Sequence, residues 1–443
     1  MFETLKQAFK VKEIRVKIWF TLLFLLIYRL GCYIPVPGVG DSLIESTDLA
    51  NLSYLNVMNM MTGGSLANGT LFAMGIGPYI NASIIIQLLA VAIPALERLS
   101  KQGEEGRKKI AQYTRYLTIL LAIIQAIGII VNYKDALTTS NGKTPLSELL
   151  FGQEWLAYVV VVLFYTAGTV ITMWIGERIT DYGVSNGISL LIFAGILATA
   201  GQSLVQMISN IGSADSSATS LTNFWKLVIM AVAIVVVFTC IVTVELAERK
   251  IPVQYAKQIR GQKMYGGQST VIPIKVNSNG VLPLIFAFSI LSFPELIITL
   301  FGLGDSPFNQ NFWAPYMSSS SWVYMVVLAL LIVFFAYFYT SIQFNSEDIS
   351  KSIQQNGGFI MGIRPGKPTA EYLKKISGRI TLFGAIFLAL VALIPSIIFK
   401  AIDASTYNAF TATGMLIAVS VALEFNTAIE SQIMMKNYKG FLK

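Results

Sequence analysis

The sequence predicts an all-α polytopic membrane protein whose ten transmembrane helices form two inverted halves of five. The first observation is composition, because 54% of the 443 residues are hydrophobic and only 13% are charged, whereas soluble domains carry about 25% charge. The second is a set of ten apolar runs, and the third is a motif that recurs in both halves. The chain also has no histidine, which weakens any proposal of histidine catalysis, metal binding or proton relay.

Ten apolar runs are long enough to cross the hydrocarbon core of a bilayer, which takes about 20 helical residues. The predicted helices cover 18–36, 74–95, 111–132, 155–175, 184–209, 224–246, 279–303, 322–343, 378–400 and 407–435. Residues 1–17 lack a cleavage-site pattern, so we interpret them as a cytoplasmic amphipathic helix. Because each half holds an odd number of helices, the N-terminal half (18–209) and the C-terminal half (210–443) would enter the membrane from opposite sides.

Positive charge predicts the orientation of the chain. Lysine and arginine gather before the first helix and in the loops after the second, sixth and eighth helices. The loop between the first and second helices has neither. Cytoplasmic loops of membrane proteins carry the excess of positive charge, so both termini are expected in the cytoplasm.

The second helix of each half begins with the same spaced motif. Gly75–Ile80 and Gly280–Ile285 both read G-x-x-P-x-I, and proline suits the first turn of a helix because no N–H is needed there. The first copy follows a polar, glycine-rich segment. Non-helical backbone is tolerated at membrane depth only where protein or a water-filled cavity surrounds it. Residues 63–89 therefore indicate a cavity within the membrane.

Charged side chains are rare in the predicted helices. Arg29, Glu295 and Glu424 are among the few, and buried charges are what usually mark ion and proton pathways. The polar residues that recur, as between Asn81 and Gln87, are neutral. Two interpretations stay open for them: hydrogen bonds between packed helices, worth about 0.6 kcal/mol on average, or a seam that opens.

Two predicted cytoplasmic loops, residues 247–278 and 344–377, are too long to be simple connections. Both are basic and contain a Gly-Gly pair. The positive-inside rule alone explains some of this charge. We favour the alternative that the loops are docking surfaces for an acidic or nucleic-acid-rich partner.

Four stretches of the chain resemble one family, in the order in which that family has them. They are Arg29–Gly38, Thr70–Leu89, Glu248–Lys257 and Gly362–Gly366. Together they are similar to the SecY family, the channel subunits of the bacterial Sec protein translocase. The resemblance implies two five-helix halves around a central pore, through which unfolded polypeptides cross the cytoplasmic membrane or leave sideways into lipid. It implies no enzyme activity, no cofactor and no metal.

The resemblance also assigns roles to individual residues. A ring at the constriction of the pore would consist of Ile76, Ile80, Ile188, Ile192, Ile285 and Ile417. A plug on the outer side, about residues 56–69, would include Asn56, Gly63, Gly64, Ser65, Leu66 and Gly69. A lateral gate, between helices 2 and 3 and helices 7 and 8, would include Asn81, Ser83, Gln87 and Asn277. Docking of a motor or ribosome would use Arg249, Lys250, Lys257, Lys263, Arg364 and Lys367.

The implied partners are the small membrane subunits SecE and SecG, the SecA motor ATPase, the ribosome, signal peptides, nascent or precursor polypeptides, and membrane lipid. Two other classes stay open. A secondary transporter of a small solute would also suit inverted repeats and glycine-broken helices, although the scarcity of buried charge argues against ion coupling. The other is an insertase or scaffold that forms no pore.

Overall fold

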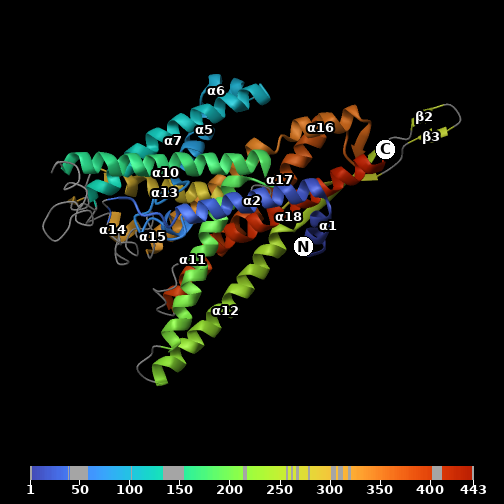
Figure 1. Ribbon diagram of the computed structural model, residues 1–443. Coiled ribbons are helices and arrows are strands. Elements are labelled where there is room, and N and C mark those ends of the chain that lie inside the picture. Colours follow the sequence, from blue (N-terminus) through green and yellow to red (C-terminus); the bar gives the residue numbers. More distant parts are fainter. Residues whose placement is uncertain are drawn as a thin grey trace.

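The long helices of the computed structural model coincide with the ten apolar runs of the sequence (Figure 1). The structure describes residues 2–37, 39, 58–100, 102–132, 154–212, 217–255, 258–260, 263–265, 269–277, 280–300, 306–307, 313–317, 321–401 and 412–441. Ten helices in these ranges have 16 or more residues. They are α2 (Lys12–Gly31), α5 (Gly77–Ala92), α7 (Glu104–Asn132), α10 (Glu154–Tyr182), α11 (Gly187–Gly212), α12 (Ser217–Glu245), α13 (Leu282–Leu300), α15 (Trp322–Gln343), α17 (Lys367–Ala401) and α18 (Ala412–Phe441).

Most of these helices meet the length and composition of a membrane span. Within the described residues, seven are long and apolar enough to cross a bilayer. The number is eight if α5 and the short α6 (Pro94–Ser100), which meet at 107°, form one span. α13 counts only as a shorter apolar helix, and α2, whose first turns are basic, is not among the seven. The prediction of a mostly helical, polytopic membrane protein is confirmed.

Several helices begin earlier than predicted, among them α12, which begins at Ser217 and not at 224. α7 begins at Glu104 and not at 111, and α17 begins at Lys367 and not at 378. Hydropathy marks only the part of a helix that lies in lipid, whereas α7 and α17 continue as amphipathic segments. The predicted loop 344–377 also contains α16 (Ser346–Gln355), whose first turn is capped by the side chain of Asn345. A further short helix, α14, covers Ala314–Met317.

The amino-terminal segment forms two helices where one was expected. α1 (Phe2–Lys10) ends next to Val11, and α2 follows directly. Ala8, Ile14 and Ile18 are buried in one cluster with Ile429 and Ile433 of α18. The apolar face of the predicted amphipathic helix therefore packs against the last helix of the chain.

The long loops contain strands that the helical prediction did not include. They are β1 (Glu248–Tyr255), β2 (Gln258–Arg260), β3 (Lys263–Tyr265), β4 (Ser269–Lys275) and β5 (Gly358–Ile360). β1 pairs antiparallel with β4 and with β5, so one sheet of order β4-β1-β5 joins the two loops. β2 and β3 form a separate hairpin, which projects away from the helices (Figure 1).

This three-stranded sheet has a hydrophobic core of its own. Ile251 and Val253 of β1, Ile274 of β4 and Ile360 of β5 are buried together with Leu373 of α17. Alternation of apolar and polar residues over a few positions is the pattern of a strand with one buried face. The two loops are thus one folded unit, anchored on α16 and α17.

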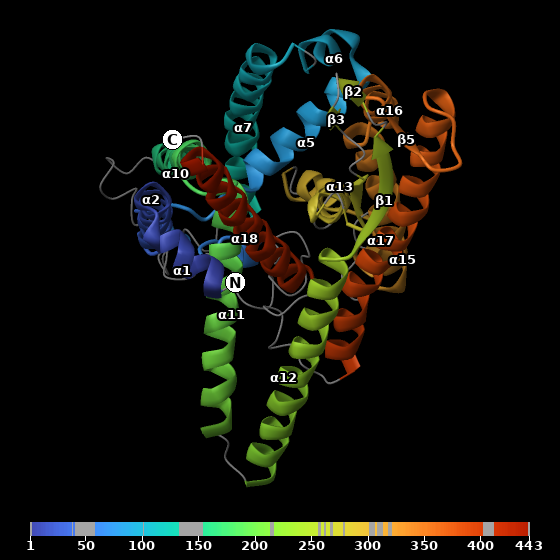
Figure 2. The ribbon, with the colours of Figure 1, turned by 90° about the vertical axis from the view of Figure 1, so that its right-hand side faces the viewer.

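The membrane helices pack around three large apolar clusters (Figure 2). One joins α13, α15 and α17, and a second joins α7 and α10 with the segment around Leu66. The third takes side chains from α2, α5, α10, α11 and α18. α11 and α12 lie side by side and extend beyond the other helices. The third cluster is therefore where the two predicted halves meet.

The repeated G-x-x-P-x-I motif has the same backbone conformation in both copies. Gly75 has φ +49° and Gly280 has φ +57°, a left-handed conformation that glycine adopts at little cost. Ile80 and Ile285, five residues later, both pack against the third apolar cluster. The two copies thus end one segment, turn, and start a helix in the same way. The division into halves at residue 210 stays a prediction.

We predict that Gly168→Ala destabilises the protein. A Cβ at Gly168 of α10 would lie 2.9 Å from the carbonyl carbon of Leu71 and nearer still to its oxygen, so the backbone must shift. Overpacking of this kind costs about 1–3 kcal/mol. The midpoint of thermal unfolding should fall by several degrees.

Gly201→Ala is the matched control, because a Cβ at Gly201 in α11 meets nothing within 4 Å. It should leave the midpoint unchanged or raise it, since alanine favours helix more than glycine does. Equal midpoints for the two variants would contradict the close approach of α10 and Leu71.

Candidate functional site

Six isoleucine side chains from four separate segments meet in the third apolar cluster. They are Ile76, Ile80, Ile188, Ile192, Ile285 and Ile417. Ile76, Ile192 and Ile417 are buried, and the other three are partly buried against them. The residues that the resemblance assigns to a pore ring are therefore neighbours, although they are spread over 340 positions of the sequence.

Local helix geometry explains how each segment supplies its part. Ile76 and Ile80 are four residues apart at the start of α5, and Ile188 and Ile192 are four apart on α11. Residues at this spacing lie on one face of a helix, one above the other. Each pair therefore presents a continuous apolar stripe to the cluster.

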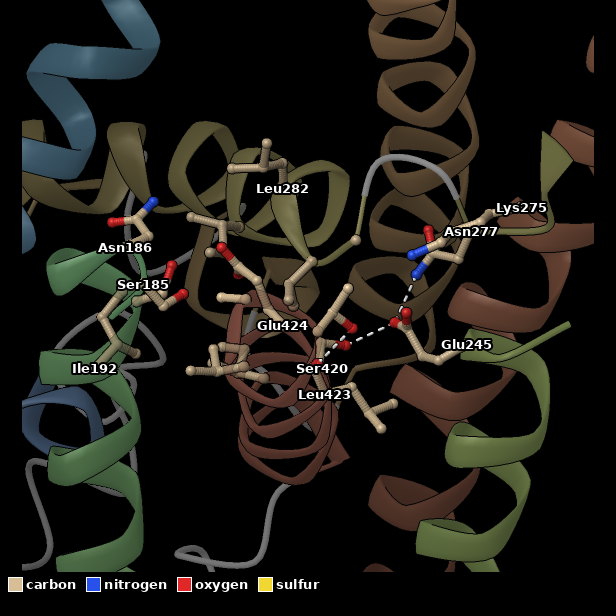
Figure 3. A pocket seen from close by; sticks show the side chains of 18 of the residues that line it. Ser185, Asn186, Ile192, Glu245, Lys275, Asn277, Leu282, Ser420, Leu423 and Glu424 are labelled. Atoms are coloured by element: carbon tan, nitrogen blue, oxygen red, sulfur yellow. Dashed lines mark hydrogen bonds between the residues drawn. The ribbon is translucent and has the colours of Figure 1, made fainter. Parts of the chain in front are cut away.

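A cavity of about 620 Å³, lined by both polar and apolar side chains, lies on one side of the isoleucines (Figure 3). Its walls come from the start of α11, the end of α12, the residues before and at the start of α13, and the later turns of α18. Glu245, Asn277, Ser420 and Glu424 are among its polar residues. The cavity also reaches Ile417, so it ends at the isoleucine cluster.

A compact segment, residues 58–69, lies on the opposite side. It is one helical turn followed by turns that use left-handed glycines, with φ +70° at Gly63 and +56° at Gly69. The side chain of Asn59 accepts from the N–H of Ala67 at 3.0 Å, which closes the loop on itself. Ser65 and Leu66 are fully buried. Among the predicted plug residues, Asn56 lies outside the described residues.

This segment is held through its backbone carbonyls. Thr199 Oγ1 of α11 donates to the carbonyl of Met60 at 3.0 Å, and Arg29 Nη1 of α2 lies 3.4 Å from the carbonyl of Gly63. Gly195 of α11 leaves no space there, since a Cβ would lie 2.7 Å from the carbonyl carbon of Met61. Arg29, a charge without an evident neighbour in the sequence, also lies over the ring of Tyr33 at 5.3 Å.

The order of these features can be followed along a single helix. On α11, Ser189 and the preceding Asn186 line the cavity, Ile192 joins the cluster, and Thr199 binds the compact segment. Thirteen residues of helix span about 20 Å. α18 passes the same features in the opposite chain direction: Gly414 lies beside Met60, Ile417 in the cluster and Glu424 at the cavity, so the order in space is the same. The cavity, the isoleucine cluster and the compact segment therefore follow one another in that order.

Two pairs of helices meet beside this axis. The hydroxyl of Tyr339 on α15 donates to Gln87 Oε1 on α5, and Gln87 Nε2 donates to Ser83 at 3.0 Å. Ile84 of α5 is buried in the same cluster as α13 and α15, and α7 contacts α13. These four helices, α5 and α7 with α13 and α15, are the second, third, seventh and eighth of the ten long helices. The seam predicted between the two pairs is closed here.

The four predicted gate residues are not together at this seam. Ser83 and Gln87 take part in it, and Asn81, two residues before Ser83, is half-buried. Asn277 has a different contact, since its side-chain amide donates to Glu245 in the cavity wall at 2.8 Å. Tyr339, Glu245 and Thr199 were not identified from the sequence, because tyrosine and glutamate near the end of a helix and threonine within one are ordinary residues.

Four predicted docking residues are exposed on or beside the sheet. They are Arg249, Lys250, Arg364 and Lys367. Lys250 Nζ lies 3.1 Å from Glu248 on the surface, where such an ion pair contributes little. Lys263 is in β3, and Lys257 lies outside the described residues. Pairing of β1 with β5 brings basic residues of both loops to one unit.

Comparison with known proteins decides the family. A family profile described as SecY matches residues 70–426. The protein translocase subunit SecY of Streptomyces coelicolor is 41% identical over 451 aligned positions that cover all of both chains. The chain belongs to the SecY family. It is a protein-conducting channel subunit of the Sec translocase and not an enzyme.

Solved structures share the fold of this SecY-family chain. One, described as the structure of a protein conducting channel, has a TM-score of 0.64 and 20% identity, over 94% of this chain and 91% of that one. Sec61 in a canine ribosome-channel complex has a TM-score of 0.62 and 19% identity, with the same coverage. The expectation of a channel from sequence is confirmed, and a small-solute transporter is excluded as the family.

We predict that Thr199→Val loosens the compact segment. The change removes the hydroxyl that binds the Met60 carbonyl and keeps the shape of the side chain. A lost hydrogen bond of about 1 kcal/mol corresponds to roughly fivefold faster exchange, so amide hydrogens of residues 58–69 should exchange about fivefold faster by mass spectrometry.

Thr169→Val is the control, because Thr169 Oγ1 donates to the Tyr165 carbonyl of its own helix. It should leave exchange of residues 58–69 at the wild-type rate. Slow exchange in both variants would mean that Thr199 does not hold the segment.

Proposed function

We propose that the six isoleucines form the seal of the idle channel. The observation that supports this is their position between the cavity and the compact segment, in the same spatial order on α11 and α18. A narrow apolar constriction excludes ions by dewetting. Isoleucine offers no side-chain hydrogen bond, so it suits a passage for chains of any sequence.

Residues 58–69 act as the plug, a second seal on the outer side of the isoleucines. Their attachment through backbone carbonyls to Thr199 and Arg29 supports this role. A few such bonds, each worth about 1 kcal/mol, hold the plug in the idle state. They break when a substrate enters, and the plug is released.

The seam of α5 and α7 against α13 and α15 is the lateral gate. Its polar contact at Gln87 and Tyr339 joins two neutral groups, and such contacts in membrane proteins are weak. The gate therefore parts without separating charges. A hydrophobic segment within the pore leaves through it into lipid.

The β4-β1-β5 sheet and its flanking residues form the docking surface for the SecA motor ATPase and the ribosome. Exposed arginine and lysine from both loops support this, because ribosomal RNA and acidic protein surfaces attract positive charge. The related Sec61 chain was solved in a ribosome-channel complex. The sheet lies on the cytoplasmic side, with both termini, in a bacterial cytoplasmic membrane.

The small subunits SecE and SecG complete the complex, and the motor or the ribosome supplies the energy. Signal peptides open the channel, and nascent or precursor polypeptides pass through it. The test is direct: a precursor stalled during translocation should crosslink to a cysteine placed at Ile80 or Ile417. A lack of crosslinks at both positions would contradict a central pore.

We predict that Ile417→Asn loosens the closed state. Asparagine places an amide among apolar side chains that cannot pair with it, and water enters the constriction instead. Ion conductance of the idle channel should rise, and precursors with defective signal sequences should be exported more efficiently.

Ile417→Leu is the control, because leucine keeps the volume and the apolar character of the site. It should conduct as little as the wild type. If Ile417→Asn also leaves both conductance and the export of defective precursors unchanged, Ile417 does not belong to the seal.

We predict that Arg364→Glu weakens binding of SecA or the ribosome several-fold, with the larger loss at low salt because surface electrostatics are screened by ions. Lys108→Glu is the control, since Lys108 is also exposed but lies on α7, outside the sheet unit. Equal losses for the two variants would point to net charge and not to this surface.

A further inference from the structure

Glu245, the last residue of α12, connects three elements that are distant in sequence. Its Oε1 accepts from Asn277 Nδ2, between β4 and α13, at 2.8 Å. The same oxygen accepts from Ser420 Oγ of α18 at 2.6 Å (Figure 3). We call these three residues the Glu245 clasp.

The donors of the clasp are buried and directed away from their own segments. Ser420 is 7% exposed and Asn277 is 8% exposed. Other helix hydroxyls here, such as those of Thr118 and Thr172, donate to the carbonyl four residues earlier in their own helix. Ser420 instead donates to another helix. Hydrogen bonds to a carboxylate are about twice as strong as neutral ones, so the clasp fixes α18 to α12.

One end of the clasp leads directly to the docking sheet. β1 begins three residues after Glu245, and β4 ends two residues before Asn277. Between them, the N–H of Val276 donates to the carbonyl of Ala247 at 2.9 Å. A displacement of the β1–β4 pair would therefore move Glu245 and Asn277.

The other end leads to the seal. Ser420 follows Ile417 by three residues, on the same face of α18. Asn277 precedes Gly280, whose left-handed backbone turns the chain into α13 and Ile285. The clasp thus lies between the docking sheet and two residues of the isoleucine cluster.

We propose that Glu245 is a positioning residue that couples the docking sheet to the seal. With the clasp formed, α18 and the start of α13 hold Ile417 and Ile285 in the closed cluster. A partner that displaces the sheet breaks the clasp and lowers the cost of opening. The inference rests on the proposed roles of the sheet and of the isoleucines.

The test is single-channel recording of the reconstituted translocase complex, with and without SecA. Glu245→Ala should raise the open probability of the idle channel about tenfold, and the ratio of open probabilities with and without SecA should fall toward one. Glu245→Gln, which keeps an acceptor oxygen, should lie between Glu245→Ala and wild type. Adding Asn277→Ala and Ser420→Ala to Glu245→Ala should change little, because residues that act as a unit are not additive.

Glu104→Gln is the matched control, since it removes an exposed carboxylate at the start of α7, outside both the clasp and the docking sheet. It should gate as the wild type does. A purely structural role for Glu245 would lower the yield or thermal stability of the complex without changing open probability per channel, and would overturn the proposal.

Ile417→Asn distinguishes failure of the Glu245 coupling from failure of the isoleucine seal. If it opens the idle channel while Glu245→Ala and Glu245→Gln gate as wild type, the coupling is wrong and the seal stands. If neither Ile417→Asn nor Glu245→Ala changes conductance and precursors do not crosslink to the cluster, the seal itself is wrong.

Discussion

The arrangement depends on one constraint, namely that the closed centre is apolar contact between side chains of separate elements. Isoleucines from the starts of α5, α11 and α13 and from α18 touch without a hydrogen bond between them. Such contact is non-directional and roughly proportional to buried area, so it closes the centre and sets no preferred route for opening it. The route by which the centre opens must therefore be set by other contacts. The polar contacts around the cluster set it, because each joins particular elements with a defined geometry.

Those polar contacts are few, and each involves a different side of the seal. Thr199 binds the Met60 carbonyl beside the compact segment, Tyr339 binds Gln87 at the seam, and Glu245 binds Asn277 and Ser420 at the cavity. Neutral hydrogen bonds contribute about 0.5–1.5 kcal/mol each, and those to a charged group about 1.5–3 kcal/mol. Contacts of this size are strong enough to bias a closed state and weak enough for a binding partner to break them one at a time. A channel held closed by large polar networks would lack this property.

The ten helices could be predicted from the sequence because lipid requires about 20 apolar residues for every crossing. The isoleucine cluster followed only from the family resemblance, since any single isoleucine in a membrane protein is an ordinary apolar residue. The strands were not predicted because β1 and β4, of eight and seven residues, mix apolar with polar positions and lie in loops that hydropathy separates from the membrane helices. The partners of polar side chains were also out of reach. Thr199 and Met60 are 139 residues apart, and Tyr339 and Gln87 are 252 apart, so neither local pattern nor periodicity relates them.

The two glycine turns connect the isoleucine cluster to two different segments, which we propose lie toward opposite sides of the membrane. Gly75 and Gly280 share a left-handed backbone and lead to Ile80 and Ile285 in the same cluster. The segment before Gly75 is the proposed plug, whereas the segment before Gly280 carries Asn277 and follows β4 of the proposed docking sheet. If the halves are inverted as the basic loops predict, equivalent hinges connect the cluster to the outer side in one half and to the cytoplasm in the other. The isoleucine cluster would then respond both to a plug that leaves on the outer side and to a partner that binds on the cytoplasmic side.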